Sequence, residues 1–446
     1  MTKRLAQVIL VGWWAAFVLT GEETPVSFQK DIEPVLKKQC LGCHMPQNKQ
    51  GGLLLSSYAD FEKGGGKGPG FTTVVGYISG ERQPRMPFGG KPLPDETIAT
   101  FRRWVAEGAK DDSKAGNTQV SETIPPAVYT APPLVMAVAF SPDGKLLAVA
   151  GYREILLHEY GGKLLARLPG IAMRIHSIAF SPDGKRLAAV GGDPAVRGEL
   201  QIWDVASRKQ TASVLASNDT FFGVSFSPDG TKIAFAGADK SVRLYDAETG
   251  KEIRKMDHHE EWSFGTTFGV DGKRLVSVSR DRAAKLTEVE TGRFIENVNL
   301  LREPLTALVR HPKKDWIAVG GAERVPYLYK LDRPRTMRIA DDSTLIRKFE
   351  KQDGPILSLA ISPDGQYLAV GSEVGDVHIY NLETGEPTGK CTGHLGGIYS
   401  LAFHPGSKEL LTAGFDGMVR SYDISGKLLK AFAPVPLEKT TVARND

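Results

Sequence analysis

The strongest constraint on the fold of this chain is a turn sequence that recurs through its last three hundred or so residues. The tetrapeptide Ser-Pro-Asp-Gly occurs four times and degenerate forms occur three times, at intervals of 40 to 51 residues. Proline fixes φ, aspartate hydrogen-bonds to nearby backbone and glycine tolerates positive φ, so each tetrapeptide predicts a tight turn. The seven turns begin at Ser141, Ser181, Ser227, Gly269, His311, Ser362 and His404.

Alternating apolar residues lie on both sides of each turn, as in IHSIAF before the turn at Ser181 and KRLAAV after it. This period of two predicts a strand, a turn and a second strand. A third strand in most units has an aromatic residue directly before its last residue, as in LQIWD and VRLYD. Four short strands in a unit of this length are typical of a propeller blade. The sequence therefore predicts an all-β seven-bladed propeller over residues 134–434 and a disordered tail over residues 435–446.

These units resemble the WD-repeat family, most clearly in the unit that begins CTGHLGGIYSLAFHPG and ends VRSYD. The resemblance implies that His394, Thr412, Asp416 and Tyr422 form a buried hydrogen-bonded network that holds this blade together. It also implies that the propeller is a docking surface for a partner protein.

The run Asp257-His258-His259-Glu260-Glu261 has the composition of a metal site, but it occupies the loop where the family places its structural histidine. A structural role is therefore favoured over a metal site.

The first 21 residues read as a leader. Lys3 and Arg4 precede the apolar run VILVGWWAAFVL, which is shorter than the roughly 20 residues that span a bilayer. This pattern predicts a signal peptide, or an N-terminal anchor that tethers the protein to a membrane, and hence export to the periplasm. The formal net charge of +4 implies no nucleic-acid partner.

Residues 25–109 form a second predicted domain, which residues 110–133 join to the propeller as a linker rich in small polar residues and proline. Its most informative stretch is Cys40-Leu41-Gly42-Cys43-His44, a Cys-x-x-Cys-His pattern that predicts covalent attachment of one haem c. In this interpretation Cys40 and Cys43 form thioethers and His44 binds the iron. Three alternatives are disfavoured. A thioredoxin-type pair would need a βαβ context, whereas an amphipathic helix pattern precedes Cys40, and a zinc site would need a second pair of ligands, which this segment lacks. A disulfide across two residues would be strained.

Elimination points to Met86 as the second axial ligand. Met45 adjoins His44 and cannot reach the opposite face of a porphyrin, whereas Met86 lies in the proline- and glycine-rich stretch RMPFGGKPLP. The alternatives are that Met86 fills a gap in a small core, that the iron keeps an open position, or that Lys91 is the ligand.

Amphipathic helices are predicted on both sides of this region, one leading into Cys40 and one over Asp95–Ala109. With the Cys-x-x-Cys-His stretch between them, residues 25–109 resemble class I cytochrome c, and more narrowly the planctomycete-type cytochrome c domain. The resemblance implies an all-α domain in which Phe28 or Ile32 contacts Trp104.

Together these patterns predict an exported monohaem c-type cytochrome that transfers single electrons to a redox partner, with the propeller as its interaction scaffold. Two alternatives remain open. In one, the propeller carries the active site of a redox enzyme and the cytochrome relays electrons. In the other, the haem is a redox or gas sensor.

Overall fold

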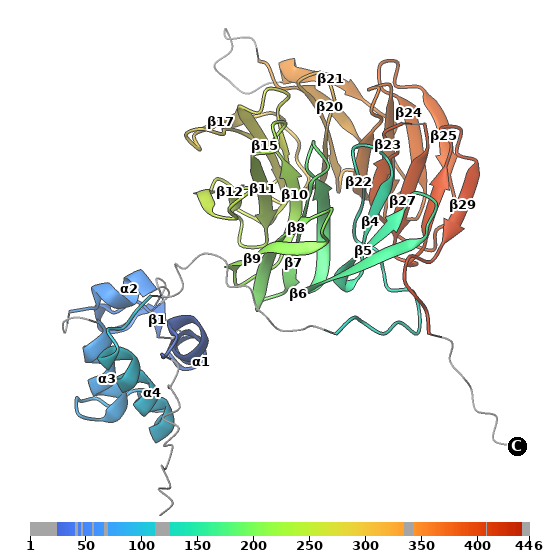
Figure 1. The fold of residues 1–446 in the computed structure, drawn as a ribbon. Coiled ribbons are helices and arrows are strands. Elements are labelled where there is room, and N and C mark those ends of the chain that lie inside the picture. Colours follow the sequence, from blue (N-terminus) through green and yellow to red (C-terminus); the bar gives the residue numbers. More distant parts are fainter. Residues whose placement is uncertain are drawn as a thin grey trace, which may run out of the picture. The chain divides into compact units, whose positions relative to one another are not determined.

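The structure of this chain is a computed structural model that describes residues 25–40, 43–45, 48–55, 58–66, 70–111, 125–333, 342–406 and 408–438. The leader, most of the predicted linker and the last eight residues of the predicted tail lie outside the described residues. The chain divides into two compact units, residues 1–116 and 117–446. Each unit is described by itself (Figure 1). Within the described ranges, no helix is both long enough and apolar enough to cross a membrane.

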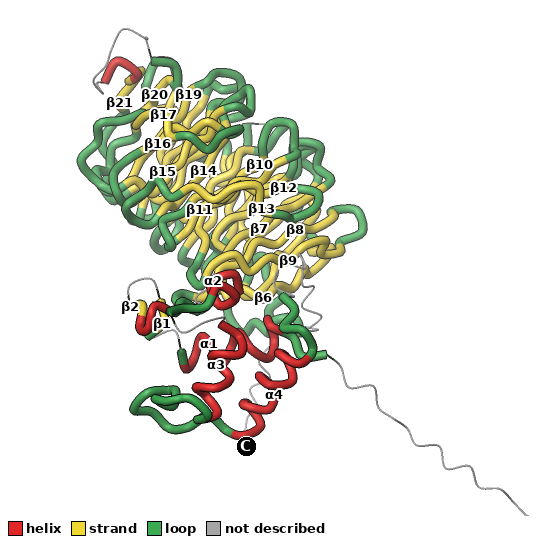
Figure 2. Tube along the Cα trace, turned by 90° about the vertical axis from the view of Figure 1, so that its left-hand side faces the viewer, coloured by secondary structure: helices red, strands yellow, loops and turns green. Residues whose placement is uncertain are grey.

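The first unit is mainly helical (Figure 2). Its elements are η1 (Phe28–Ile32), α1 (Glu33–Gln39), β1 (His44–Met45), β2 (Asn48–Lys49), η2 (Gln50–Gly52), α2 (Tyr58–Lys63), α3 (Gly70–Ser79) and α4 (Asp95–Ala106). Ser27 caps the first helical segment, because its Oγ accepts from the Lys30 backbone N–H at 2.9 Å. Asp95 and Glu96 place negative charge in the first turn of α4, where the helix dipole favours it. The expectation of an all-α domain is wrong in one respect, since β1 and β2 pair as a short antiparallel ladder.

An aromatic cluster forms the core of this unit. Trp104 is fully buried, and the rings of Phe28, Phe61 and Phe71 lie 5.5, 5.9 and 5.0 Å from it between centroids. The contact expected between Phe28 and Trp104 is therefore present. It joins the first helical segment to α4 and fixes the two ends of the described unit together.

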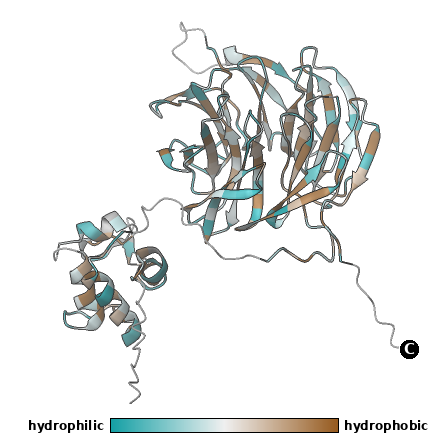
Figure 3. Cartoon of the chain, viewed as in Figure 1, coloured by the Kyte–Doolittle hydropathy of each residue, from teal (hydrophilic) through white to brown (hydrophobic). Residues whose placement is uncertain are grey.

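The second unit consists of antiparallel sheets, in which apolar residues concentrate along the strands (Figure 3). The first sheet contains, in spatial order, β3 (Val138–Phe140), β4 (Leu146–Ala150), β5 (Tyr152–Glu159), β6 (Leu164–Phe180), β7 (Arg186–Asp193), β8 (Arg197–Asp204) and β9 (Lys209–Ser217). The next two sheets are β10 (Phe221–Phe226), β11 (Lys232–Gly237), β12 (Val242–Asp246) and β13 (Glu252–Met256), then β14 (Ser263–Phe268), β15 (Arg274–Ser279), β16 (Ala284–Glu288) and β17 (Phe294–Asn297).

Three further four-stranded sheets complete the unit. They are β18 (Leu305–Arg310), β19 (Trp316–Gly321), β20 (Tyr327–Lys330) and β21 (Leu345–Lys348), with η3 (Asp342–Thr344) before β21. They continue with β22 (Ile356–Ile361), β23 (Tyr367–Ser372), β24 (Val377–Asn381) and β25 (Pro387–Cys391). The last sheet is β26 (Ile398–Phe403), β27 (Leu410–Gly414), β28 (Val419–Tyr422) and β29 (Leu428–Phe432).

The described strands make seven blades, because β6 serves two of them. Its first half pairs with β5 as the outer strand of the first blade, and its second half pairs with β7 as the first strand of the second blade. The first strands of successive blades contact one another, and β26 contacts β3, which closes the ring. At this closure Val135 N donates to Gly414 O at 2.9 Å and Val138 N donates to Ser400 Oγ at 3.0 Å. The unit is thus a closed seven-bladed propeller.

The turns between the first two strands of the blades have the predicted chemistry. Ser141 Oγ donates to Asp143 Oδ1 at 2.6 Å, the same carboxylate accepts from the Lys145 backbone N–H at 3.1 Å, and Gly144 has φ +73°. The turns at Ser181, Ser227 and Ser362 repeat the serine–aspartate bond at 2.5 to 2.6 Å. These donors hold the pKa of the turn aspartates below the ordinary value.

A clasp of residues from both ends of the unit covers the closure between the seventh and first blades. Tyr129 forms a parallel bridge with Leu437, and its hydroxyl donates to Glu154 Oε1 at 2.7 Å. Arg167 Nη2 pairs with the same carboxylate oxygen at 2.6 Å. Val435 is also buried here, so the prediction of a disordered tail is wrong for residues 435–438. Residues 435–438 are ordered because they cover apolar surface of the closure that would otherwise be exposed to water.

Candidate functional site

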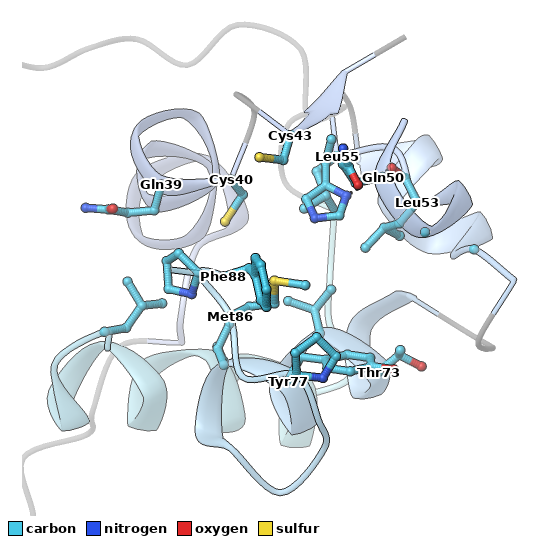
Figure 4. Close-up of a pocket in the computed structure, with 18 residues that line it drawn as sticks. Gln39, Cys40, Cys43, Gln50, Leu53, Leu55, Thr73, Tyr77, Met86 and Phe88 are labelled. Atoms are coloured by element: carbon cyan, nitrogen blue, oxygen red, sulfur yellow. Dashed lines mark hydrogen bonds between the residues drawn. The ribbon is translucent and has the colours of Figure 1, made fainter. Parts of the chain in front are cut away.

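The first unit contains a cavity of about 600 Å³ between α1, β1, α3 and the loop that precedes α4. Cys40, Cys43, His44 and Met86 all line it, together with apolar side chains that include Val74, Ile78 and Leu93. Figure 4 shows the sulfur atoms of Cys40 and Met86 facing the same space. The structure therefore brings together the four residues that the sequence singled out. Lys91, the weaker candidate, is exposed and is not among the residues lining this cavity.

A tight backbone turn places the two thiols and the imidazole. The amides of Cys43 and His44 both donate to Cys40 O at 3.2 Å, so the chain reverses directly after α1. His44 Nδ1 lies 3.2 Å from Leu53 O, and Leu55 N donates to His44 O at 3.0 Å. With Nδ1 directed at a carbonyl, Nε2 is the ring nitrogen left to bind a metal.

Cys40 lacks the properties of a redox thiol. Burial, assisted by the neighbouring Cys43, raises the pKa of Cys40 to about 11, whereas a thiol that attacks disulfides needs a lowered pKa. Cys40, Cys43 and Cys391 are all free thiols. The raised pKa of Cys40 does not favour nucleophilic attack by this thiol.

Met86 is held by the backbone, since its N–H donates to Tyr77 O at 3.0 Å at the end of α3. Its half-buried side chain packs against the core of the unit and reaches the cavity from the side opposite β1. Two thiols, an imidazole and a thioether around an apolar cavity suit a large, flat, apolar group that carries a soft metal. The donor set fits haem c, which stays a prediction. No group of three or more His, Cys, Asp or Glu side chains in the described residues could hold a metal ion.

The structural network of the seventh blade is formed by three of its four predicted members. His394 Nδ1 lies 3.0 Å from Asp416 Oδ1, and its Nε2 lies 2.7 Å from Thr412 Oγ1. Tyr422 does not join them, because its hydroxyl donates to Thr392 O at 2.6 Å. The prediction of a four-member network is therefore wrong for Tyr422, whose hydroxyl is bound to a backbone carbonyl instead.

The histidine run of the fourth blade has the same structural role. His259 is buried, with Nδ1 2.8 Å from Asp281 Oδ2 and Nε2 2.7 Å from Ser277 Oγ. Burial alone would raise the pKa of Asp281, but the hydrogen bond and charge of His259 lower it well below its usual range. His258 instead lies 2.9 Å from Gly292 O. The run therefore stabilises a blade and does not gather around a metal.

One residue in the first strand of each of six blades is left unpaired at a β-bulge. The register shifts fall at equivalent places in β6, β10, β14, β18, β22 and β26. Because these strands surround the axis of the ring, their bulge residues form a rim around its central channel. This channel-mouth ring consists of His176, Phe222, Phe264, Thr306, Leu357 and Tyr399, all of them half-buried.

Aromatic side chains are concentrated on one part of that ring. The ring of Phe222 lies 5.3 Å from His176, 5.2 Å from Phe264 and 5.9 Å from Trp262, which is 41% exposed in the loop before β14. The Arg280 guanidinium lies 5.7 Å from the centre of the Trp262 ring. We call His176, Phe222, Trp262 and Phe264 the aromatic patch. It consists of three members of the channel-mouth ring and the adjoining Trp262, and Phe222 contacts each of the other three.

Sequence reasoning missed these residues although the repeats contain a signal for them. Each member of the channel-mouth ring lies five residues before the start of its turn, as His176 does before Ser181 and Phe222 before Ser227. In most units this position, five residues before the turn, holds a large side chain that interrupts the alternation of inward and outward residues along the strand. Such an interruption could have indicated a bulge.

Comparison with known proteins gives matches to WD repeats. The profile of the WD domain, G-beta repeat, matches residues 125–155, 162–204, 209–246 and 385–423, and the profile of the anaphase-promoting complex subunit 4 WD40 domain matches residues 308–395.

Three curated relatives share between 32% and 33% identity with this chain. An uncharacterised WD repeat-containing protein of Schizosaccharomyces pombe is 32% identical over 27% of this chain and 19% of its own length. The LST8 homolog of Drosophila melanogaster is 32% identical over 26% of this chain and 36% of its own length. Subunit I of eukaryotic translation initiation factor 3 from Brugia malayi is 33% identical over 23% of this chain and 36% of its own length. The matches thus span between about a fifth and just over a third of these relatives.

These findings correct the function predicted from the sequence. Both matching profiles describe WD repeats, neither covers residues 25–109, and none of the three relatives is named for electron transfer. The expectation of a single-electron carrier with a redox partner is contradicted, and its alternatives of a redox enzyme or a haem-based sensor go with it. That expectation extended a five-residue motif in the first unit to the function of the whole chain.

Proposed function

We infer that this chain is an interaction scaffold whose propeller docks a partner protein at the aromatic patch. WD-repeat relatives support this proposal, and the name of one of them, subunit I of translation initiation factor 3, describes a component of an assembly. The single observation that carries it is the exposure of Trp262 beside Phe222 at the end of the channel. A partly exposed tryptophan packed against a second aromatic ring is the kind of residue that dominates interface energetics.

The charges near the patch define the chemistry of the partner. Arg280 lies over the Trp262 ring, and Arg174 is exposed two residues before His176. Neither arginine forms an ion pair in the part of the chain that the structure describes. Both can therefore pair with carboxylates of a bound segment. We propose that the patch binds a peptide segment in which an apolar side chain stands next to acidic residues.

The patch is preorganised for this task. Phe222 on β10 packs against His176 on β6 and Phe264 on β14, so little side-chain entropy is lost when a partner covers these rings. Burial, followed by the charge of Arg174, lowers the pKa of His176 to about 4, so this ring is neutral at physiological pH. Its neutral imidazole adds to the apolar floor of the patch. Glu260 and Glu261 precede Trp262 and would disfavour acidic residues on that side.

A peptide-display selection on the full chain tests this proposal. Selected peptides should combine an apolar residue with acidic neighbours and should bind in a saturable way. Trp262→Ala should weaken them by about tenfold or more, because loss of a central aromatic residue commonly costs over 1 kcal/mol. Phe294→Ala is the matched control, since Phe294 is 39% exposed on the outer strand β17. Equal losses in the two variants, or peptides without acidic residues, would contradict the proposal.

For the first unit, we propose that Cys40 and Cys43 attach one haem c through thioether bonds. His44 Nε2 and the Met86 thioether would be the protein ligands of its iron, and the bound group would supply an iron that can change between Fe(II) and Fe(III). The donor set, the apolar lining and the cavity support this proposal. Export, and a membrane tether if the leader is retained, follow as proposals from the leader sequence.

Haem-linked peroxidase staining of the denatured polypeptide tests the attachment. After expression with haem-maturation machinery the chain should stain, the double variant Cys40→Ala/Cys43→Ala should not, and Cys391→Ala should stain like the original. The far-red absorption of a ferric iron bound to a Met sulfur should disappear in Met86→Leu. An unstained original chain would refute this proposal without affecting the docking proposal.

A further inference from the structure

A second cavity, of about 370 Å³, lies in the fifth blade, β18–β21. It is separate from the channel-mouth ring and from the cavity of the first unit. Its lining comes from the loop before β18, the turn after β19, and strands β20 and β21. Six of the lining residues carry the argument, namely Leu301, Arg302, Glu303, Glu323, Tyr327 and Lys348.

The fifth blade lacks the structural histidine that the fourth and seventh blades have, His259 and His394. His259 lies four residues before β14, and the equivalent position before β18 holds Leu301. Asp281 lies two residues after β15, and the equivalent position after β19 holds Glu323. The carboxylate is retained but its imidazole partner is gone. The space between the loop and the turn is therefore left open instead of being filled by a ring.

The walls of the cavity are preformed. Tyr327 and Tyr329 are 4% and 0% exposed, and their rings are stacked with centroids 6.2 Å apart. Tyr327 Oη donates to Glu323 Oε1 at 2.9 Å, which fixes the direction of that carboxylate. The Lys348 ammonium lies 5.6 Å from the centre of the Tyr327 ring. Both a cation and an anion thus flank one tyrosine.

Four charged side chains of both signs line this one cavity without neutralising one another. Arg302 and Lys348 are cationic, Glu303 and Glu323 are anionic, and none of the four forms an ion pair within the described residues. Opposite charges that are held apart around a small cavity can be bridged by a ligand that carries both signs. A ligand with only one charge would leave half of the site unsatisfied.

We propose that this cavity binds a small zwitterion of the free α-amino acid class. Arg302 and Lys348 would hold its carboxylate, Glu323 and Glu303 its ammonium group, and the tyrosine rings with Leu301 its side chain. The volume lies near the lower end of the range for small-molecule sites, which suits a ligand of this size. This site is independent of the docking proposal, because it uses none of the residues of the aromatic patch.

Thermal unfolding of the full chain in the presence of each standard L-amino acid at millimolar concentration tests the proposal. A ligand that binds only the folded state raises the unfolding temperature by mass action. At least one amino acid should do so, and titration calorimetry should give one site per chain. Its N-acetyl and its amide derivatives, which each lack one of the two charges, should bind at least about tenfold more weakly.

Variants separate this site from adventitious binding. Lys348→Gln should weaken the amino acid and its N-acetyl derivative, whereas Glu323→Gln, which retains an acceptor for Tyr327, should weaken the amino acid and its amide derivative. Lys209→Gln, an exposed change on β9, is the matched control and should bind like the original chain. No shift with any amino acid, or equal binding by the singly charged derivatives, would overturn the proposal.

Discussion

Replacing Tyr129 by phenylalanine should destabilise the propeller at the point where its ring closes. The hydroxyl donates to the buried carboxylate of Glu154 at 2.7 Å and accepts from the Tyr152 backbone N–H at 3.0 Å. A hydrogen bond to a charged group contributes about 1.5–3 kcal/mol and a neutral one about 1 kcal/mol. Glu154 keeps Arg167, whose Nε and Nη2 donate to it at 2.8 and 2.6 Å, so no charge is left unpaired. We therefore expect a loss of about 2 kcal/mol.

Urea unfolding of the full chain, followed by tryptophan fluorescence and far-UV circular dichroism, measures this loss. Tyr152→Phe is the control, because Tyr152 is 43% exposed and its hydroxyl makes no hydrogen bond in the described residues. It should change the free energy of unfolding by less than about 0.5 kcal/mol. If the two variants were equally stable, the clasp would not hold the ring closed and the reasoning would be refuted.

Three further changes test other parts of the structure. His394→Ala leaves Asp416 and Thr412 without their imidazole partner and should lower the free energy of unfolding by about 2–4 kcal/mol in the same urea assay. An unchanged free energy of unfolding would show that this network does not stabilise the blade. Gly144→Ala should destabilise by more than about 1 kcal/mol, because φ is +73° and the new methyl group would lie 2.6 Å from His404 Nε2; an unchanged unfolding midpoint would contradict this. The third change concerns pH. Burial lowers the pKa of His176 to about 4, so stability from this residue is complete above its ordinary pKa of about 6.5 and is lost as the pH falls toward 4. His176→Phe should therefore lose less stability than the original chain between pH 7 and pH 5, and an equal loss would exclude the effect.

The repeats make most of the propeller predictable from the sequence. The Ser-Pro-Asp-Gly turns specify their own hydrogen bonds, and the period of two on each side specifies the strands, so blade number and strand order follow from local chemistry. The continuity of β6 across two blades could not be predicted, because no turn residue or apolar pattern distinguishes a shared strand from two strands. The burial of Val435 was also missed, since it depends on a surface formed only when the ring closes.

The site residues were predictable to different degrees. The gathering of Cys40, Cys43, His44 and Met86 followed from motif spacing and elimination, because a short motif fixes local geometry. The channel-mouth ring depends on β-bulges, and a prediction that assumes strict alternation of inward and outward residues along each strand does not detect a bulge. The cavity of the fifth blade lies where a structural histidine is missing, and a missing residue leaves no sequence pattern that would indicate a cavity. The function of the chain was wrongly predicted because a five-residue motif does not determine which partner a separate domain of three hundred or so residues recognises.

Hydrogen–deuterium exchange with a peptide selected on the full chain tests the docking proposal most directly. The proposal predicts slower exchange in segments 173–176, 220–224 and 262–265, which contain the aromatic patch and the strands that present it. Exchange at the turns that begin at Ser181 and Ser227 should stay unchanged. Protection confined to those turns or to outer strands such as β17 and β29, with none around Trp262, would contradict the assignment of the aromatic patch as the docking surface.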